Sequence, residues 1–175
     1  NDGDMDIVSA STGDNTIAWY ENTASTAFDP LFTANTISTS ADGVYDVFAA
    51  DVNGDGDMDV LSASFNDDGI AWFENNGSES FTAYTIATDA DGAHAVHAID
   101  MDNDGDMDVL SASVYDDAIR WFINDGSQGF TDNTLTGSTN AVRDIFPIDL
   151  DQDGDLDVLA AEYEGDRIVV LRNDG

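Results

Sequence analysis

The chain contains no cysteine and no lysine, and its basic side chains are four arginines and two histidines. Without cysteine no disulfide can cross-link the fold, and the redox compartment cannot be read from thiols. The 37 acidic residues give a net charge of −33, which repels phosphate backbones and anionic lipid surfaces. Nucleic acid and anionic membranes are therefore excluded as partners, and cations are the natural partner.

Long apolar runs are also missing, and none approaches the roughly 20 residues that a membrane-spanning helix needs. We therefore expect no membrane insertion. The chain is not a disordered acidic tail either, because 42% of its residues are hydrophobic and 10% are aromatic. Its 175 residues suffice for one ordinary domain with a core.

One ten-residue segment recurs four times, as "DGDMDIVSAS" at 2–11, "DGDMDVLSAS" at 55–64 and 104–113, and "DGDLDVLAAE" at 153–162. The successive copies are 53, 49 and 49 residues apart. A second segment, written "IAWFEN" in its clearest copy, keeps the same spacings at 17–22, 70–75, 119–124 and 168–173. A period near 50 residues indicates one supersecondary unit repeated in a solenoid or a propeller.

Each repeat is typical of four short strands separated by turns. In the second repeat we expect strands at 44–52, 59–65, 70–75 and 81–87, with the acidic loop after the first. The turn signals and the lack of helical periodicity predict an all-β fold. Four strands at this period describe a blade, so the predicted fold is a partial β-propeller of four-stranded antiparallel blades. Pro147 fits this pattern if its strand lies at the edge of a sheet.

The repeats divide the chain into one propeller fragment over 1–175. It comprises a partial blade without its first strand at 1–40, blades at 41–89 and 90–138, and a partial blade without its last strand at 139–175. This is about half of a closed ring, since propellers have 4–8 blades. Raw edges at both ends would pair or aggregate. We therefore expect an excerpt of a longer protein, and association of two copies is the alternative.

The acidic loops follow the pattern D-x-[DN]-x-D-G-D-x-D, so oxygen-bearing side chains fall at every second position of a tight turn. A hard dication takes about six to eight oxygen ligands in flexible geometry, and alternate side chains of such a turn converge on one ion. The glycine permits the sharp bend. In each loop the seventh residue is expected to contribute its backbone carbonyl. The candidate ligands are Asp51, Asn53, Asp55, Asp57 and Asp59; Asp100, Asp102, Asp104, Asp106 and Asp108; and Asp149, Asp151, Asp153, Asp155 and Asp157.

The first loop retains only Asp2, Asp4 and Asp6, so we expect weak metal binding or none there. In the three full loops the ion is predicted to be calcium. Magnesium prefers one or two carboxylates with several waters, and zinc prefers histidine and cysteine. Plain solvated turns would leave like charges close together without a counter-ion. An EF-hand is excluded because the twelfth loop positions hold residues that cannot chelate, namely Ser62, Ser111 and Ala160.

The motifs "DxDxDGDxDVLSAS" and "IAWFEN" resemble the FG-GAP/VCBS-type repeat of integrin alpha subunits and many secreted bacterial proteins. The letters FG-GAP are themselves absent, so the chain resembles the bacterial VCBS-like branch more than the integrins. The resemblance covers essentially the whole chain. It implies a β-propeller whose calcium loops join the first and second strands of each blade and rigidify that connection. It also implies an extracellular or cell-surface setting and a role in adhesion or ligand binding.

The acidic surface and two further columns of the repeat carry expectations of their own. Many acidic residues lie outside the loops, which suits a marine or halophilic source. His97 replaces Phe48 and Phe146, so we expect a satisfied core histidine. Another column holds tryptophan in three repeats, which favours packing between blades over a sugar platform, at Trp19, Trp72 and Trp121.

The column that varies most holds Tyr45, His94 and Arg143, at the strand ends opposite the acidic loops. Loops on a rigid scaffold commonly carry binding residues, so these three are the candidate ligand site. The favoured function is a noncatalytic module for adhesion or for binding a glycan or protein. Two alternatives stay open. One is part of a polysaccharide lyase, with Tyr45 or His94 as base and Arg143 offsetting a uronate carboxylate; the other is a purely structural spacer.

Overall fold

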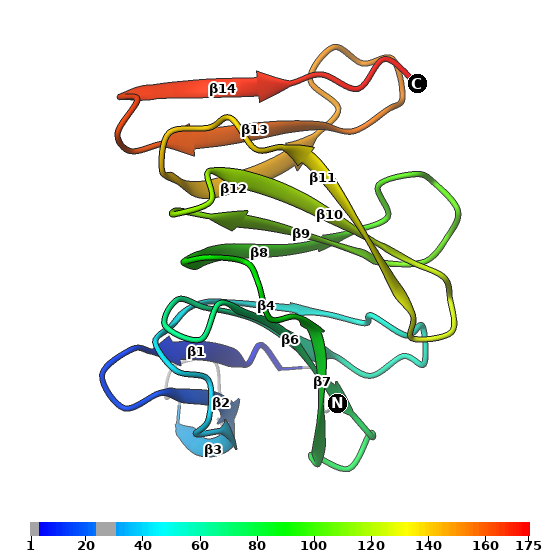
Figure 1. Ribbon diagram of the computed structural model, residues 1–175. Helices are drawn as coiled ribbons and strands as arrows, with labels where there is room; N and C mark the ends of the chain where they lie inside the picture. The colour runs from blue at the N-terminus through cyan, green and yellow to red at the C-terminus, as the bar shows by residue number, and fades with distance from the viewer. Residues whose placement is uncertain (1–3, 24–30) are drawn as a thin grey trace.

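The computed structural model describes residues 4–23 and 31–175, and these residues form four antiparallel sheets without a helix (Figure 1). Sheet 1 contains β1 (Ile7–Ser11), β2 (Thr16–Asn22) and β3 (Phe32–Ser38). Sheet 2 contains β4 (Val44–Ala50), β5 (Asp59–Ser64), β6 (Gly69–Asn75) and β7 (Phe81–Ala87). Sheet 3 contains β8 (Ala93–Ile99), β9 (Asp108–Ser113), β10 (Ala118–Asn124) and β11 (Phe130–Thr136). Sheet 4 contains β12 (Val142–Ile148), β13 (Asp157–Glu162) and β14 (Arg167–Leu171).

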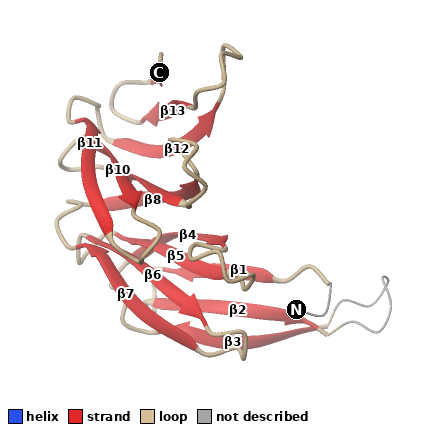
Figure 2. Ribbon diagram, turned by 90° about the vertical axis from the view of Figure 1, so that its right-hand side faces the viewer, coloured by secondary structure: helices blue, strands red, loops and turns tan. Residues whose placement is uncertain are grey.

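Each sheet is a simple meander, because strands that follow one another in the chain are neighbours in the sheet. The sheets follow one another in space as well, from sheet 1 at the bottom of Figure 1 to sheet 4 at the top. The stack is open, with sheets 1 and 4 at its two ends (Figures 1 and 2). The expected all-β class and antiparallel pairing are confirmed. No helix among the described residues could cross a bilayer.

The second strand of each full sheet is buried along its whole length. β5 and β9 share the sequence DVLSAS, and all six residues of each are buried. Neighbouring sheets cover both faces of β5 and β9. Their sequences therefore mix small and large side chains rather than alternating between apolar and polar ones. Pro147 lies in β12, at the edge of sheet 4, where its missing N–H costs no ladder hydrogen bond.

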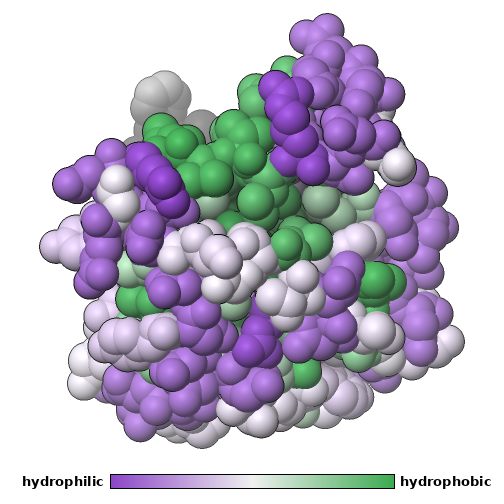
Figure 3. All heavy atoms as spheres, turned by 45° about the horizontal axis from the view of Figure 1, so that its top comes forward, coloured by the Kyte–Doolittle hydropathy of each residue, from purple (hydrophilic) through white to green (hydrophobic). Residues whose placement is uncertain are grey.

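The core lies between successive sheets and not within any one of them. One apolar cluster joins β5 and β6 to β8 and β9, and another joins β8, β9 and β10 to β12 and β13. An isoleucine column shows the effect of this stacking: Ile17, Ile70 and Ile119 are fully buried, whereas Ile168 in β14 is 77% exposed. On the surface, apolar side chains gather in one hollow with hydrophilic flanks (Figure 3).

Candidate metal centre and ligand face

The acidic loops join the first and second strands of sheets 2, 3 and 4, at 51–58, 100–107 and 149–156. Backbone N–H groups inside each loop orient the carboxylates. In the middle loop Asp100 accepts hydrogen bonds from the N–H groups of Asp104 at 3.1 Å and Gly105 at 3.0 Å. Asp104 accepts one from the N–H of Asp106 at 2.9 Å. The loop therefore folds around its own first carboxylate, which holds the side chains at positions one, three and five close together.

Two of these loops bring three carboxylates into one cluster. Oxygens of Asp100, Asp102 and Asp104 all lie within 4.8 Å of one another, and those of the equivalent Asp149, Asp151 and Asp153 do the same. Two oxygens that each lie 2.3–2.6 Å from one calcium ion are at most about 5.2 Å apart. The donor set of each cluster therefore fits a single hard cation.

In the loop at 51–58 an asparagine takes the third position. The Oδ1 of Asn53 accepts a hydrogen bond from the N–H of Asp55 at 3.0 Å, as Asp102 does from the N–H of Asp104 at 3.2 Å. Its Nδ2 donates to Asp55 and to Glu74, each at 3.0 Å. The amide oxygen thus occupies the place of the carboxylate, with one negative charge fewer.

The last cluster includes a nearby arginine. A nitrogen of Arg172 lies 2.5 Å from an oxygen of Asp151. Desolvation and the carboxylates of Asp153 and Asp157 raise the pKa of Asp151, while Arg172 acts in the opposite direction. Asp153 and Asp157 thus disfavour the charged form of Asp151, and a cation bound between these carboxylates would offset that effect.

The ninth position of each loop differs from the others, because Asp59, Asp108 and Asp157 are fully buried. Both oxygens of Asp59 accept backbone hydrogen bonds, from Val52 at 3.1 Å and from Asn75 at 2.8 Å. Asp108 repeats this arrangement with Met101 and Asn124, as Asp157 does with Leu150 and Asn173. The ninth residue therefore ties the acidic loop to the end of the third strand. A carboxylate has about four lone-pair sites, so this role leaves capacity for a metal ligand.

In Asp59 and Asp108, burial and hydrogen bonding shift the pKa of the carboxyl group in opposite directions. Burial raises the pKa of Asp59, and the N–H of Asn75 lowers it. Burial likewise raises the pKa of Asp108, and hydrogen bonds from the Asn124 N–H and the Trp121 indole lower it. The hydrogen bonds therefore offset part of the cost of burying a charge.

The asparagine that donates this bond at the end of the third strand begins an Asn-x-Gly turn, a role that was not predicted from the sequence. The Nδ2 of Asn124 donates to the carbonyl of Met107 at 2.9 Å, and its Oδ1 accepts from the N–H of Gly126 at 3.1 Å. Gly126 has φ +69°, and a Cβ there would lie 2.5 Å from a carboxylate oxygen of Asp106. The signal was present as "NNG", "NDG" and "NDG" at 75–77, 124–126 and 173–175.

The first loop keeps only part of this arrangement. The N–H of Asn22 donates to Asp6 at 2.8 Å, so the hairpin tie is present in the first repeat as well. Asp4 and Asp6 are exposed. Asp2 lies outside the described residues.

At the opposite strand ends the structure places Tyr45, His94 and Arg143 in equivalent positions. Each is the extra residue of a β-bulge, because the pairing of the first strand with the second skips it in sheets 2, 3 and 4. A bulge turns its extra side chain away from the regular alternation of the strand. The three residues line one shallow depression of about 160 Å³.

Aromatic rings that the sequence reasoning did not name surround these bulges. The ring of Tyr45 lies 5.1 Å from that of Phe65 and 4.7 Å from that of His94, between centroids. Phe65 lies 5.1 Å from Tyr115 in turn. Their sequence signal was the residue or two after each second strand, as in "SASF", "SASVY" and "AAEY" at 62–65, 111–115 and 160–163.

The row continues into sheet 4. The guanidinium carbon of Arg143 lies 3.8 Å from the ring centre of Tyr163, and the Nδ1 of His94 lies 2.8 Å from the carbonyl of Arg143. We call this set the aromatic row: Tyr45, Phe65, His94, Tyr115, Arg143 and Tyr163.

His97 is half-buried between the rings of Phe48 at 4.2 Å and Phe146 at 5.9 Å. Its Nδ1 is buried without a hydrogen-bond partner among the described residues, so the expectation of a satisfied histidine was wrong. The tryptophan column packs between sheets as expected at Trp72, which is 1% exposed, and less completely at Trp19 and Trp121.

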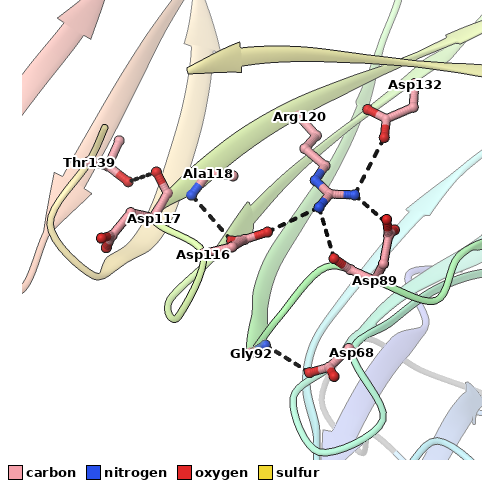
Figure 4. A network of polar contacts seen from close by, with 9 residues as sticks. All are labelled: Asp68, Asp89, Gly92, Asp116, Asp117, Ala118, Arg120, Asp132 and Thr139. Atoms are coloured by element: carbon pink, nitrogen blue, oxygen red, sulfur yellow. Dashed lines mark hydrogen bonds and ion pairs between the residues drawn. The ribbon is translucent and has the colours of Figure 1, made fainter. Parts of the chain in front are cut away.

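A third polar feature, separate from the acidic loops and from the bulge residues, is centred on Arg120 in β10 (Figure 4). Its guanidinium contacts Asp89 at 2.8 Å, Asp116 at 3.1 Å and Asp132 at 3.4 Å. These carboxylates come from the β7–β8 connection, the β9–β10 turn and β11. The side chain of Arg120 is 12% exposed, so it links sheet 3 to the connection from sheet 2.

Comparisons with known proteins agree with the repeat pattern. The family model described as the FG-GAP-like repeat matches residues 1–62, 51–111 and 105–160. A solved structure of an Agrocybe aegerita lectin, which recognises non-reducing terminal N-acetylglucosamine, resembles the chain with a TM-score of 0.58 at 18% identity. The likeness covers 89% of this chain and 46% of the lectin chain, and at this identity it shows the fold alone. A comparison with curated proteins finds no match.

Proposed function

Because the chain belongs to the family of FG-GAP-like repeats, we propose that it is a noncatalytic, calcium-binding propeller module that binds a carbohydrate or protein ligand. We place it in a secreted or cell-surface protein, where millimolar calcium would fill weak sites. The acidic surface without lysine agrees with a salty habitat.

The observation that carries the calcium proposal is the convergence of three carboxylates in each of two loops. In the remaining full loop, at 51–58, Asn53 supplies a neutral oxygen between Asp51 and Asp55, and calcium accepts amide oxygens as ligands. We therefore propose about three calcium sites, held by the first, third and fifth positions of each loop, with contributions from the seventh and ninth.

The residues of the loop do most of the positioning before any ion binds. Internal N–H groups aim the carboxylates of Asp100 and Asp104, and buried Asp108 ties the loop to Asn124. Calcium supplies positive charge that offsets the repulsion between the carboxylates. Since the ion binds only the folded loop, it should stabilise the native state by mass action.

Calcium titration with matched variants tests this proposal. Isothermal titration calorimetry of the metal-free protein should give about three sites, and the melting temperature should rise with calcium. Asp104→Ala should remove one site, whereas Asp102→Asn should keep it, because Asn53 stands at the equivalent position of the 51–58 loop. Unchanged melting on chelation, or equal loss of a site in both variants, would contradict the proposal.

The ligand-binding part of the proposal draws on the likeness to a lectin and on the exposed aromatic row. A glycan array probed with the intact protein in calcium should show binding, which a spacer would not. The lyase alternative is tested with a uronate oligomer. The noncatalytic module should release no unsaturated product, which would be visible as ultraviolet absorbance.

A further inference from the structure

We infer that the aromatic row is the binding site for a neutral oligosaccharide, and that this sugar makes no contact with the metal. The inference rests on the proposed carbohydrate ligand. It adds where the sugar binds, that the sugar is neutral, and that sugar binding at one end of the module does not involve the metal at the other.

The scaffold under the row is constant, whereas the presented side chains vary. The residues just before the three bulges, Val44, Ala93 and Val142, are fully buried. The bulge residues themselves change from tyrosine to histidine to arginine, and Tyr45 is 49% exposed. A rigid frame that presents variable polar and aromatic side chains is typical of a recognition surface.

The row offers ring faces next to hydrogen-bonding groups. Tyr115 is 66% exposed and Tyr163 is 61% exposed. Tyr115 is held in place, since it packs beside Gly92, where an added Cβ would lie 2.9 Å from its ring. A pyranose has an apolar C–H face that stacks on such rings and a rim of hydroxyls that needs donors and acceptors. Arg143 and Glu164 line the same depression and offer a donor and an acceptor to these hydroxyls.

Charge narrows the class of sugar. The net charge of −33 repels uronate and sulfate polymers at long range. A cation is disfavoured locally, because the guanidinium of Arg143 already lies over Tyr163. The rings of Tyr45, Phe65 and His94 also pack against one another, so they present one outer surface rather than a cage around a cation. A neutral sugar avoids both costs.

The row lies at the far strand ends from the acidic loops. Tyr45 is the second residue of β4, and the acidic loop begins after its seventh residue. Seven strand residues span about 20 Å, too far for one sugar ring to reach the metal loop. Calcium therefore supports the site only through the stability of the sheets.

The test is calorimetric titration of the intact protein in calcium with three probes: a neutral oligosaccharide ending in N-acetylglucosamine, a uronate oligomer and spermine. The neutral sugar should bind, and Tyr115→Ala should weaken it roughly tenfold or more, which corresponds to about 1.4 kcal/mol. Tyr163→Ala should act in the same direction. Tyr84→Ala is the matched control, since Tyr84 is an exposed tyrosine of β7 outside the row.

The binding should also survive chelation at a temperature where circular dichroism shows the metal-free protein folded. If the wild type binds the sugar but both row variants bind equally well, the inference fails while the proposed function stands. Loss of binding on chelation of the folded protein would place the sugar at the metal and overturn the inference. Preference for the uronate or spermine would overturn the neutral class. No binding of any glycan would remove the proposed carbohydrate ligand as well.

Discussion

The buried carboxylate of Asp108 accepts a hydrogen bond of 2.8 Å from the backbone N–H of Asn124, sixteen residues away. This bond joins the acidic loop before β9 to the end of β10. The same pairing joins Asp59 to Asn75 and Asp157 to Asn173. The ninth loop residue is thus part of the hairpin whether or not a cation is bound, whereas the exposed Asp102 and Asp104 have no comparable structural duty.

The first prediction separates these roles by substitution. Asp108→Ala should lower the free energy of unfolding of the metal-free protein by about 3 kcal/mol or more, since it leaves the N–H groups of Met101 and Asn124 and the indole of Trp121 without their acceptor. Urea unfolding in chelator measures this loss. Asp104→Ala should instead leave the metal-free midpoint no lower, since it removes one of the mutually repelling carboxylates, and it should reduce the gain on adding calcium. If Asp108→Ala left the stability in chelator unchanged and reduced only the gain on adding calcium, Asp108 would act only as a metal ligand.

The second prediction compares two isoleucines of one repeat column. Ile119→Ala should cost about 2–5 kcal/mol, because it opens a cavity between sheets 3 and 4. Ile168→Ala should change stability by less than about 0.5 kcal/mol, because that side chain is 77% exposed. Chemical denaturation of both variants tests the pair. A large cost at Ile168 would mean that something covers this face in solution.

The sequence predicted the repeating elements well because their signals are local. The β-branched runs, the turns and the strand-edge place of Pro147 all follow from short-range rules. β4 and β5 ended at Ala50 and Ser64 rather than at 52 and 65, since strand ends depend on the loop that follows. The column of Tyr45, His94 and Arg143 was also found, because its variation stands out against a constant background.

The missed features depend on contacts between distant residues. Nothing local in "NDG" at 124–126 shows that Asn124 meets a carboxylate sixteen residues earlier. The bulges were hidden for a similar reason, since a bulge appears only when two strands are paired. Tyr115 and Tyr163 belong to turns whose meeting depends on how successive sheets stack.

The third prediction concerns Arg120, which contacts carboxylates of three segments. Arg120→Ala restores the residue found at the same column in sheets 1 and 2, Ala18 and Ala71. It should nevertheless cost about 1 kcal/mol, because Asp89, Asp116 and Asp132 lose their shared cation. High salt should narrow the difference by screening the carboxylates. Asp132→Asn, at the longest of the three contacts, should have a much smaller effect in the same urea titrations.

The last prediction concerns His97, whose column holds phenylalanine in sheets 2 and 4. Burial lowers the pKa of His97, while the carboxylates of Asp46 and Asp144 act in the opposite direction. As the pH falls below about 6.5, the imidazole of His97 therefore binds a proton in the unfolded chain while it is still neutral in the folded chain. The contribution of His97 to stability is complete above that pH and is lost as the pH falls through the folded pKa.

His97→Phe removes this proton uptake and keeps the ring contacts with Phe48 and Phe146. Between pH 7 and pH 5 the wild type should lose stability relative to the variant, and above pH 7 the difference between them should stay constant. Burial also raises the pKa of Asp46, so protonation of Asp46 stabilises the folded state as the pH falls in both proteins. Thermal melting of both proteins in chelator at each pH measures the difference directly. If that difference did not change with pH, His97 would titrate alike in the folded and unfolded chain, and its burial between the two rings would have no electrostatic cost.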